Sequence, residues 1–387
     1  MATWAETDPQ VRQKYGREIT TKAAAMNWWN KFMNNSESAI IQTDLRTEAP
    51  EGGTVRIYFR DEIEGDGVHG NQDFDDNTGT QNTLFQDVDY TLFGQSTISK
   101  NKKIESKMAA ENFRQKAHND LPKWDAKRVD KIITAKLTAN ATNIFACSAA
   151  NVLYAKNGTS SIKAGDRLTV AAIKQMKANV KNSQDAEGNE HPMIEPAFKK
   201  AIKREGEVDD YIDYYVLVVG QYGANQLKND PEYMEMQKMA ANRGNTNPLF
   251  SGAMADIDGV IIFERNNWNA KRAGIMTSDI KDFKVTVKGE TVVYADGIDG
   301  YAGASGHKTE IALFLGATAG LYPIAEQSDY YEEDKDASRK LKVAIDRGMG
   351  FAKTHFIGKT VEQQASEYHN KDFGSAVIVY SAEMWKE

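Results

Sequence analysis

The chain has 387 residues, of which 41% are hydrophobic and 27% are charged, with a formal net charge of −7. This composition is typical of a folded soluble protein that is long enough for two or more hydrophobic cores. The mild acidity disfavours wholesale binding of nucleic acid to the surface. The single cysteine, Cys147, excludes an internal disulfide, favours a reducing compartment and is interpreted as a buried apolar filler.

Membrane insertion and secretion are not expected. No apolar run approaches the roughly 20 residues that a membrane-spanning helix needs. Residues 1–6 lack the basic and apolar segments of a signal peptide. We therefore expect the chain to fold in the cytosol, with no membrane as a partner.

Residues 1–48 predict an N-terminal arm that contains a helix. Asp8 and Pro9 are a typical helix start, because Asp caps the first turn and Pro is tolerated within it. Trp28, Trp29 and Phe32 then provide a large apolar surface for a terminal helix. We expect these three residues to anchor the arm, either on its own domain or on a neighbouring subunit, and the pattern leaves both open.

Residues 49–103 predict an extended hairpin loop. The stretch 54–59 alternates between apolar and polar residues as a strand does, and 87–98 returns as a second strand. The polar, glycine-rich stretch from 61 to 82 is too long for an ordinary turn, and connections of this length are usually functional. The candidate contact residues of the loop are acidic or aromatic: Asp61, Glu62, Glu64, Asp66, Asp73, Phe74, Asp75, Asp76 and Phe85.

Residues 104–215 predict a long spine helix and the first part of a peripheral domain. Residues 104–119 are helical in pattern, and Asp120 with Pro122 predicts that a second helix starts there. An apolar stripe then runs to about residue 145, from Leu121, Trp124, Val129, Ile132, Ile133 and Leu137. The candidate contact residues of the spine lie mainly off this stripe and are basic: Lys107, Arg114, Lys116, Lys123, Lys127, Arg128 and Lys131.

The loop and the spine carry opposite charge. There is no Lys or Arg from Asp61 to Ser99, whereas most of the charged residues among the next forty are basic. Two such patches can meet within one molecule or between copies, where charge complementarity sets register more than affinity. Two solvated faces that never touch are equally compatible with the charges.

The rest of the chain predicts a mixed axial domain, 216–324, and C-terminal strands that return to the body, 325–387. We expect helices at 169–181, 222–228 and 230–241, buried strands at 211–219 and 260–263, and a hairpin at 283–294. A strand at 311–315 is expected to lead into a helix at 316–321, and 329–336 is interpreted as an acidic surface loop. The closing strands are expected at 341–345, 351–356 and 376–380.

A catalytic or cofactor-binding constellation is not evident. The six histidines have no metal-ligand spacing, and neither GxSxG nor a P-loop is present. Asp256 and Asp258 lack the further ligands of a calcium loop. We expect no enzyme activity and no cofactor, and leave open a weak divalent-ion contact in the acidic loop.

The order of these parts resembles the major capsid proteins of tailed phages with the Hong Kong 97-type fold, and within them the family typified by coliphage N-four. The arm resembles that family in Asp8–Arg12, Trp29–Met33 and Ile40–Gln42, and the loop in Gly65–Gly70 and Asp73–Asp75. The spine resembles it from Asp120 through Trp124 to Asp130. The end of the chain resembles it in Gly348–Ile357 and Lys371–Gly374.

The resemblance implies an α+β fold with arm, extended loop, spine helix, peripheral domain and axial domain. It implies a major capsid protein that self-assembles, as hexamers and pentamers, into an icosahedral shell around double-stranded DNA, without sequence-specific binding. Scaffold, portal and decoration proteins are implied as further partners, and assembly is implied in the host cytoplasm. Cross-linking through a loop lysine is not expected, because the stretch from Asp61 to Ser99 has none, and no long helical leader is seen.

Our hypothesis for the contact is that the acidic loop of one subunit lies over the basic spine of its neighbour. Trp28, Trp29, Phe32, Phe74 and Phe85 are the candidate apolar anchors. Another virion component, such as a tail or decoration protein, is the alternative. A hydrolytic enzyme that uses exposed carboxylates is a third and weaker reading.

Overall fold

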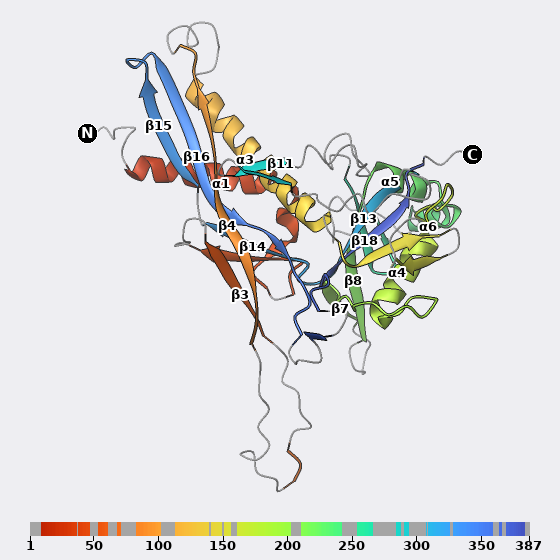
Figure 1. Ribbon diagram of the computed structural model, residues 1–387. Helices are drawn as coiled ribbons and strands as arrows, with labels where there is room; N and C mark the ends of the chain where they lie inside the picture. Colours follow the sequence, from red (N-terminus) through yellow and green to blue (C-terminus); the bar gives the residue numbers. More distant parts are fainter. Residues whose placement is uncertain are drawn as a thin grey trace.

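The computed structural model contains two mixed β-sheets with helices packed against them (Figure 1). It describes residues 9–36, 38–46, 53–60, 68–70, 83–101, 113–138, 141–148, 151–155, 161–202, 210–241, 254–265, 284–287, 290–293, 307, 309–325, 328–358, 364–365 and 369–383. The helices are α1 Pro9–Met26, the 3-10 helix η1 Trp28–Phe32, α3 Phe113–Thr138, α4 Val170–Asn182, α5 Gln221–Lys228 and α6 Pro231–Ala241. The mixed α+β class expected from the sequence is confirmed.

The first sheet has the order β1-β2-β14-β16-β4-β3, with β15 paired to β16 and β17 paired to β14. Its strands are β1 Met33–Asn34, β2 Ile41–Arg46, β3 Thr54–Arg60, β4 Thr83–Ile98, β14 Gly320–Ala325, β15 Asp329–Lys335, β16 Lys340–Gly350 and β17 Ala352–Lys353. The predicted hairpin is confirmed, because β3 and β4 pair antiparallel from Thr54↔Asp89 to Arg60↔Thr83. Beyond Asp89, β4 changes partner and pairs with β16. One long strand therefore joins the hairpin to the rest of the sheet.

The second sheet has the order β6-β5-β18-β13-β8-β10-β9, with β7 paired to β8. Its strands are β5 Ile144–Cys147, β6 Val152–Tyr154, β7 Phe198–Ile202, β8 Asp210–Val219, β9 Ala255–Ile257, β10 Val260–Glu264, β13 Thr309–Leu315 and β18 Ser375–Ser381. A separate hairpin pairs β11 Lys284–Val287 with β12 Glu290–Val293, as predicted.

Both faces of the second sheet are buried. Leu217 and Val219 of β8 pack with α4, α5 and α6, whereas the alternate residues Val216 and Val218 pack with η1, β2 and the end of α3. The predicted helices at 169–181, 222–228 and 230–241 are confirmed as α4, α5 and α6. Cys147 is buried as predicted, and burial raises the pKa of its thiol to about 12.

The spine helix differs from the prediction at both places where the sequence signalled a boundary. α3 runs through Asp120 and Pro122 without a break, because Ala117 and Leu121, on either side of Asp120, pack on the same core as Ile19 of α1 and Val343 of β16. Burial of this face outweighs the local start signal. The helix also ends at Thr138, and the apolar residues 144–147 that continue its stripe form β5 in the second sheet.

Two further expectations are wrong because they ignored pairing with distant segments. The helix expected at 316–321 is a turn followed by β14, which pairs in parallel with β2. The surface loop expected at 329–336 is β15, which pairs with β16 from Asp329↔Asp346 to Lys335↔Lys340. The strand expected at 351–356 is reduced to β17 and a single bridge at His355.

The predicted domain limits remain predictions, and the two sheets draw residues from both sides of them. β8 crosses the limit between 215 and 216, and β18 joins the second sheet from the far end of the chain. β14, placed by the sequence at the end of the axial domain, belongs to the first sheet.

Candidate inter-subunit surfaces

The acidic tip of the predicted loop lies outside the described residues. This applies to Asp61, Glu62, Glu64, Asp66, Asp73, Phe74, Asp75 and Asp76. The structure describes the strands on either side of the tip, so it fixes where the loop leaves the body.

The inner side of the β3–β4 hairpin is held firmly on the first sheet. Val55, Ile57, Val88 and Tyr90 form a small core with Leu321 of β14. The Gln86 side chain also fastens β4 to the chain around β17: its Nε2 donates to the Lys353 carbonyl at 2.6 Å, and its Oε1 accepts from the His355 amide at 3.2 Å. The direction in which the hairpin leaves the sheet is therefore set by buried contacts.

The outer side of the hairpin carries two aromatic rings and one ion pair. Tyr58 and Phe85 are opposite each other across the strands, with ring centroids 6.5 Å apart and exposed fractions of 60% and 45%. The Arg56 guanidinium lies 3.9 Å from the Phe85 ring and donates two hydrogen bonds to Asp87, at 2.8 and 3.0 Å. These bonds hold the pKa of Asp87 below its usual value. Phe85 is thus the one predicted loop residue that the structure describes, and it lies on an exposed surface.

Four lysines lie along the exposed side of α3: Lys116, Lys123, Lys127 and Lys131. Their separations of seven and four residues place them on one side of a helix, over a length of about 22 Å. Lys123 contacts Asp120 at 3.2 Å in an exposed pair. We call these four residues the lysine row.

The other predicted spine residues do not belong to this row. The Arg114 Nε donates to Glu332 of β15 at 3.0 Å, and the Arg128 guanidinium lies 5.5 Å from the Phe93 ring of β4. Both therefore contact their own first sheet. Lys107 lies outside the described residues.

The arm anchors dock on their own chain. Trp29 is fully buried and its Nε1 donates to the Thr134 hydroxyl of α3 at 3.1 Å. Phe32 is buried against Phe263 of β10, with ring centroids 5.3 Å apart. Of the two alternatives that the sequence left open, the structure shows docking within the chain for these two residues, so they are not exposed anchors for a neighbour.

Trp28 is partly buried, and two cations lie close to its ring. The Lys31 Nζ is 4.1 Å from its ring, and the Arg265 guanidinium is 4.4 Å away. Burial, and then the nearby Arg265, lowers the pKa of Lys31 to about 8. Trp28 thus joins the arm to the end of β10 within the same chain.

The comparisons with known proteins point in one direction. Residues 9–384 match the model of a family described as phage capsid protein. The chain belongs to this family. The major structural protein ORF14 of Helicobacter pylori bacteriophage KHP30 is 25% identical over 343 residues, which cover 85% of this chain and 84% of that protein. The major capsid protein of Pseudomonas phage KPP25 is 22% identical over 361 residues, covering 84% and 85%.

Solved capsid structures share the fold of this capsid protein. A chain of the head of Helicobacter pylori bacteriophage KHP40 superimposes with a TM-score of 0.68 at 21% identity, covering 92% of both chains. A capsid chain of Ralstonia phage GP4 gives 0.64 at 18% identity and covers both chains fully. The function is that of a major capsid protein of tailed phages, a structural component of the virion that forms a shell from copies of itself.

One buried carboxylate, Asp125, and one half-buried carboxylate, Asp130, lie on the spine helix of this capsid protein and were not singled out from the sequence. Asp125 pairs with Arg347 of β16 at 3.1 Å, and Asp130 pairs with Arg265 at the end of β10. One helix is thereby fastened to both sheets. Burial raises the pKa of both carboxyl groups, and the arginines oppose that shift. A signal was present: Asp125 is four residues from both Leu121 and Val129, inside the apolar stripe.

Another buried carboxylate lies in the second sheet. Glu310 of β13 accepts hydrogen bonds from the Tyr380 hydroxyl and the Gly223 amide, both at 2.7 Å. Burial raises its pKa to about 7, although these hydrogen bonds favour the charged form. The Gly223 amide belongs to the first turn of α5, so Glu310 joins that helix to β13 and β18.

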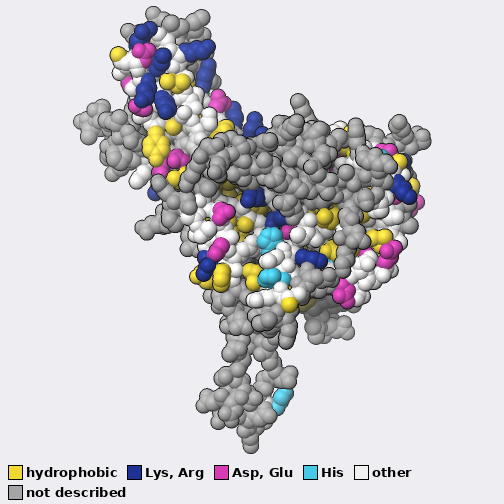
Figure 2. All heavy atoms as spheres, viewed as in Figure 1, with side chains coloured by type: hydrophobic (Ala, Val, Ile, Leu, Met, Phe, Trp, Pro, Cys, Tyr) yellow, Lys and Arg dark blue, Asp and Glu magenta, His cyan; other side chains and the backbone are white. Residues whose placement is uncertain are grey.

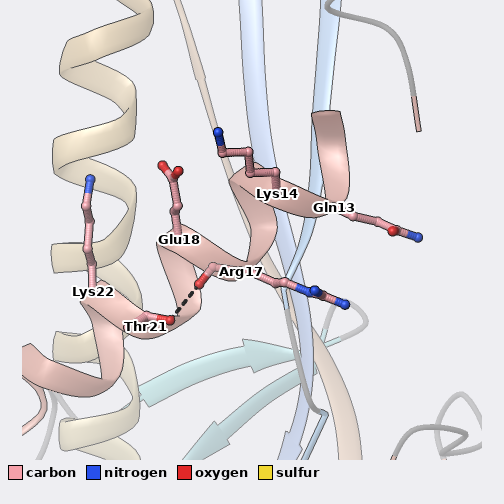
Figure 3. A pocket seen from close by; sticks show the side chains of 6 residues that line it. All are labelled: Gln13, Lys14, Arg17, Glu18, Thr21 and Lys22. Atoms are coloured by element: carbon pink, nitrogen blue, oxygen red, sulfur yellow. Dashed lines mark hydrogen bonds between the residues drawn. The ribbon is translucent and has the colours of Figure 1, made fainter. Parts of the chain in front are cut away.

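The best-defined hollow, of about 520 Å³, lies on the exposed side of α1 and is lined by Gln13, Lys14, Arg17, Glu18, Thr21 and Lys22 (Figure 3). The Thr21 hydroxyl is hydrogen-bonded to the Arg17 carbonyl one turn before it, at 2.9 Å. A hollow on one helix does not converge on a reacting atom. Among the residues that the structure describes, there is no group of three or more metal-ligating side chains. None of the described helices is long and apolar enough to cross a membrane.

Proposed function

We propose that this capsid protein assembles, as hexamers and pentamers, into an icosahedral head shell of the Hong Kong 97 type that encloses double-stranded DNA. The observation that carries the proposal is the family match over residues 9–384. The long α3 helix, the β3–β4 hairpin at the end of the first sheet and a second sheet buried on both faces agree with the parts that such a fold requires. We place the chain with the relatives of the coliphage N-four capsid protein, on the loop and spine motifs described above.

In this proposal the acidic loop of one subunit contacts the lysine row of its neighbour. Each half of the loop from 61 to 82, when fully extended, spans at most about 35 Å. This length is enough to lie along the lysine row, which is about 22 Å long. Exposed ion pairs contribute about 0–1 kcal/mol each, so the contact sets register and many copies supply the stability. Such contacts weaken as salt rises.

Assembly in the host cytoplasm, and contacts with scaffold, portal and decoration proteins, belong to the same proposal. The DNA inside is held without sequence-specific contacts. The net charge of −7 supports this, because a mildly acidic wall does not adhere to packed phosphates.

The test is electron microscopy of the purified protein, alone and with co-expressed structural proteins of the same virion. Closed particles are expected. Tubes, rings or binding only to preformed shells would show a tail or decoration protein instead.

Charge reversal tests the loop contact. A triple variant with Asp73→Lys, Asp75→Lys and Asp76→Lys is expected to fold normally and to lose assembly, and so is Lys116→Glu with Lys123→Glu, Lys127→Glu and Lys131→Glu. Mixing the two variants is expected to restore particles. The positive loop of the first variant can then contact the negative row of the second, and the acidic loop of the second can contact the lysine row of the first. The matched control reverses Lys163 and Lys199, which are exposed elsewhere. Normal assembly of either variant would contradict the loop-to-row contact.

A further inference from the structure

The long strand β4 is exposed on opposite sides in its two halves. In the half that pairs with β3, Phe85, Asp87 and Asp89 are exposed, whereas Val88 and Tyr90 are buried. In the half that pairs with β16, the even positions Leu92, Gly94, Ser96 and Ile98 are all exposed, whereas at the odd positions Phe93 and Thr97 are half-buried and Gln95 is exposed. Successive residues of a strand point to opposite sides, so the exposed side changes from odd to even positions along the strand.

The second half of β4 is part of a three-stranded ribbon, β15-β16-β4. One side of the ribbon packs on α1 and α3 through Tyr330, Leu341, Val343 and Ile345. The other side exposes Leu92, Ile98 and Tyr331, at 44%, 51% and 48%. We call these three residues the ribbon face. In Figure 2 the end of the molecule that carries β15 and β16 shows yellow apolar side chains among dark-blue basic ones.

The hairpin face consists of Tyr58, Phe85, Arg56 and Asp87. Together with the ribbon face it holds five of the nine large apolar side chains that are exposed in the described part of the chain. The two faces lie at opposite ends of β4 (Figure 1) and on opposite sides of it. They therefore do not meet within one copy. Clustered exposed apolar side chains mark interaction sites more often than scattered ones do.

Each of the two faces has an ion pair that is already formed within one copy. On the hairpin face Arg56 is already bonded to Asp87, and at the edge of the ribbon Lys335 is bonded to Glu333. An ion pair that is already formed enters an interface without an uncompensated charge. Aromatic rings against aliphatic and aromatic side chains, with arginine beside them, form the usual core of such contacts.

We propose that the hairpin face of one copy packs on the ribbon face of a second copy. The inference rests on the proposed function, since the occupant is another copy of this chain. Because the two faces differ, the contact is heterologous, and a heterologous contact that closes generates a ring. It is separate from the loop-to-row contact, because the lysine row lies on α3, on the other side of the ribbon.

Polar substitutions test whether each face is needed. Leu92→Thr with Ile98→Thr and Tyr331→Thr removes the ribbon face, and Tyr58→Thr with Phe85→Thr removes the hairpin face; threonine keeps a strand preference at exposed positions. Each variant is expected to melt as the wild type does and to raise the protein concentration needed for assembly by at least about tenfold. The matched control is Met193→Thr with Tyr211→Thr, exposed on the second sheet region, which is expected to assemble normally.

Disulfide cross-linking tests whether the two faces are partners. Cys147 is buried with a raised thiol pKa, so introduced cysteines react alone. The test uses chains that carry one introduced cysteine on each face, and these chains are oxidised in the assembled state. The hairpin face receives Tyr58→Cys or Phe85→Cys, and the ribbon face receives Leu92→Cys or Ile98→Cys. At least one pairing is expected to give a ladder of covalent oligomers on a non-reducing gel, and each single-cysteine chain is expected to give none.

The outcomes separate this contact from the proposed function. Closed particles from the wild type, together with normal assembly of both polar variants or with no ladder from any pairing, would overturn the contact and leave the function standing. A ladder from a protein that forms only tubes or rings would support the contact and contradict the closed shell.

Discussion

The two sheets of this capsid protein differ in how completely each is buried by its own chain. Every residue of β13 and β18 in the second sheet is buried. One face of this sheet is covered by α4, α5 and α6, and the other by η1, β2 and the end of α3. In the first sheet β15 is mostly exposed, β4 has exposed residues on alternate sides along its length, and α1 and α3 pack on only one side of the ribbon. The second sheet is therefore a self-sufficient core, whereas the first leaves surfaces that further copies can use.

The difference in burial between the two sheets has a physical consequence for stability and assembly. A sheet buried on both sides gains its stability within one chain, and it has no free face on which another chain could pack. A sheet buried on one side is less stable alone, and it retains a surface for assembly. The spine helix joins the two, through Asp125 to Arg347 in the first sheet and through Asp130 to Arg265 in the second.

The largest expected effect is in the second sheet. Phe314→Ala, at a fully buried position of β13, is expected to lower the free energy of unfolding by about 4 kcal/mol, because it leaves a cavity in a core that cannot collapse. Urea unfolding followed by fluorescence measures this change. A loss below about 1 kcal/mol would show that the second sheet is less tightly packed than its burial indicates.

Loss of one partner of the buried pair on the spine helix comes next. Arg347→Met is expected to destabilise the protein by about 3 kcal/mol, because Asp125 is left buried and unpaired. The double variant Asp125→Leu with Arg347→Met is expected to recover most of the loss. Equal destabilisation in the single and double variants would mean that packing, and not charge, holds α3 on the first sheet.

Glu310 predicts a pH dependence that arises in the second sheet. Its pKa is raised from 4.5 to about 7 in the fold, so the folded state binds the proton more tightly than the unfolded state does. This stabilisation, about 3 kcal/mol, is fully present below pH 4.5 and is lost as pH rises through 7. Glu310→Gln is expected to flatten the stability profile between pH 4.5 and 7 while that of the wild type falls. Parallel profiles for the two proteins would contradict this assignment.

The smallest effect is expected on the ribbon. Tyr331→Thr and Ile98→Thr are each expected to change the free energy of unfolding of the monomer by no more than about 0.5 kcal/mol, since exposed positions contribute little. Thermal melts of the unassembled protein check this. A large loss would mean that these side chains stabilise their own fold, and the contrast between the two sheets would weaken.

Local pattern was sufficient for the elements whose partners are adjacent in the chain. The β3–β4 hairpin, the β11–β12 hairpin and α4 were all predicted, because alternation, turn residues and helical periodicity are local properties. The acidic loop and the basic helix are also plain in the sequence, although the loop tip lies outside the described residues. Of the predicted basic residues, only the structure separates the exposed lysine row from Arg114 and Arg128, which contact their own sheet.

The sequence by itself determined the order of the parts, the hairpin, the spine helix and the charges they carry. Only the tertiary structure decided that Trp29 and Phe32 dock on their own chain, that α3 continues through Asp120 and Pro122, and that β15 is a strand. The reason is the same in each case. A buried side chain or a paired strand gains free energy from residues far away in the chain, and that gain outweighs the local preference that a sequence pattern records.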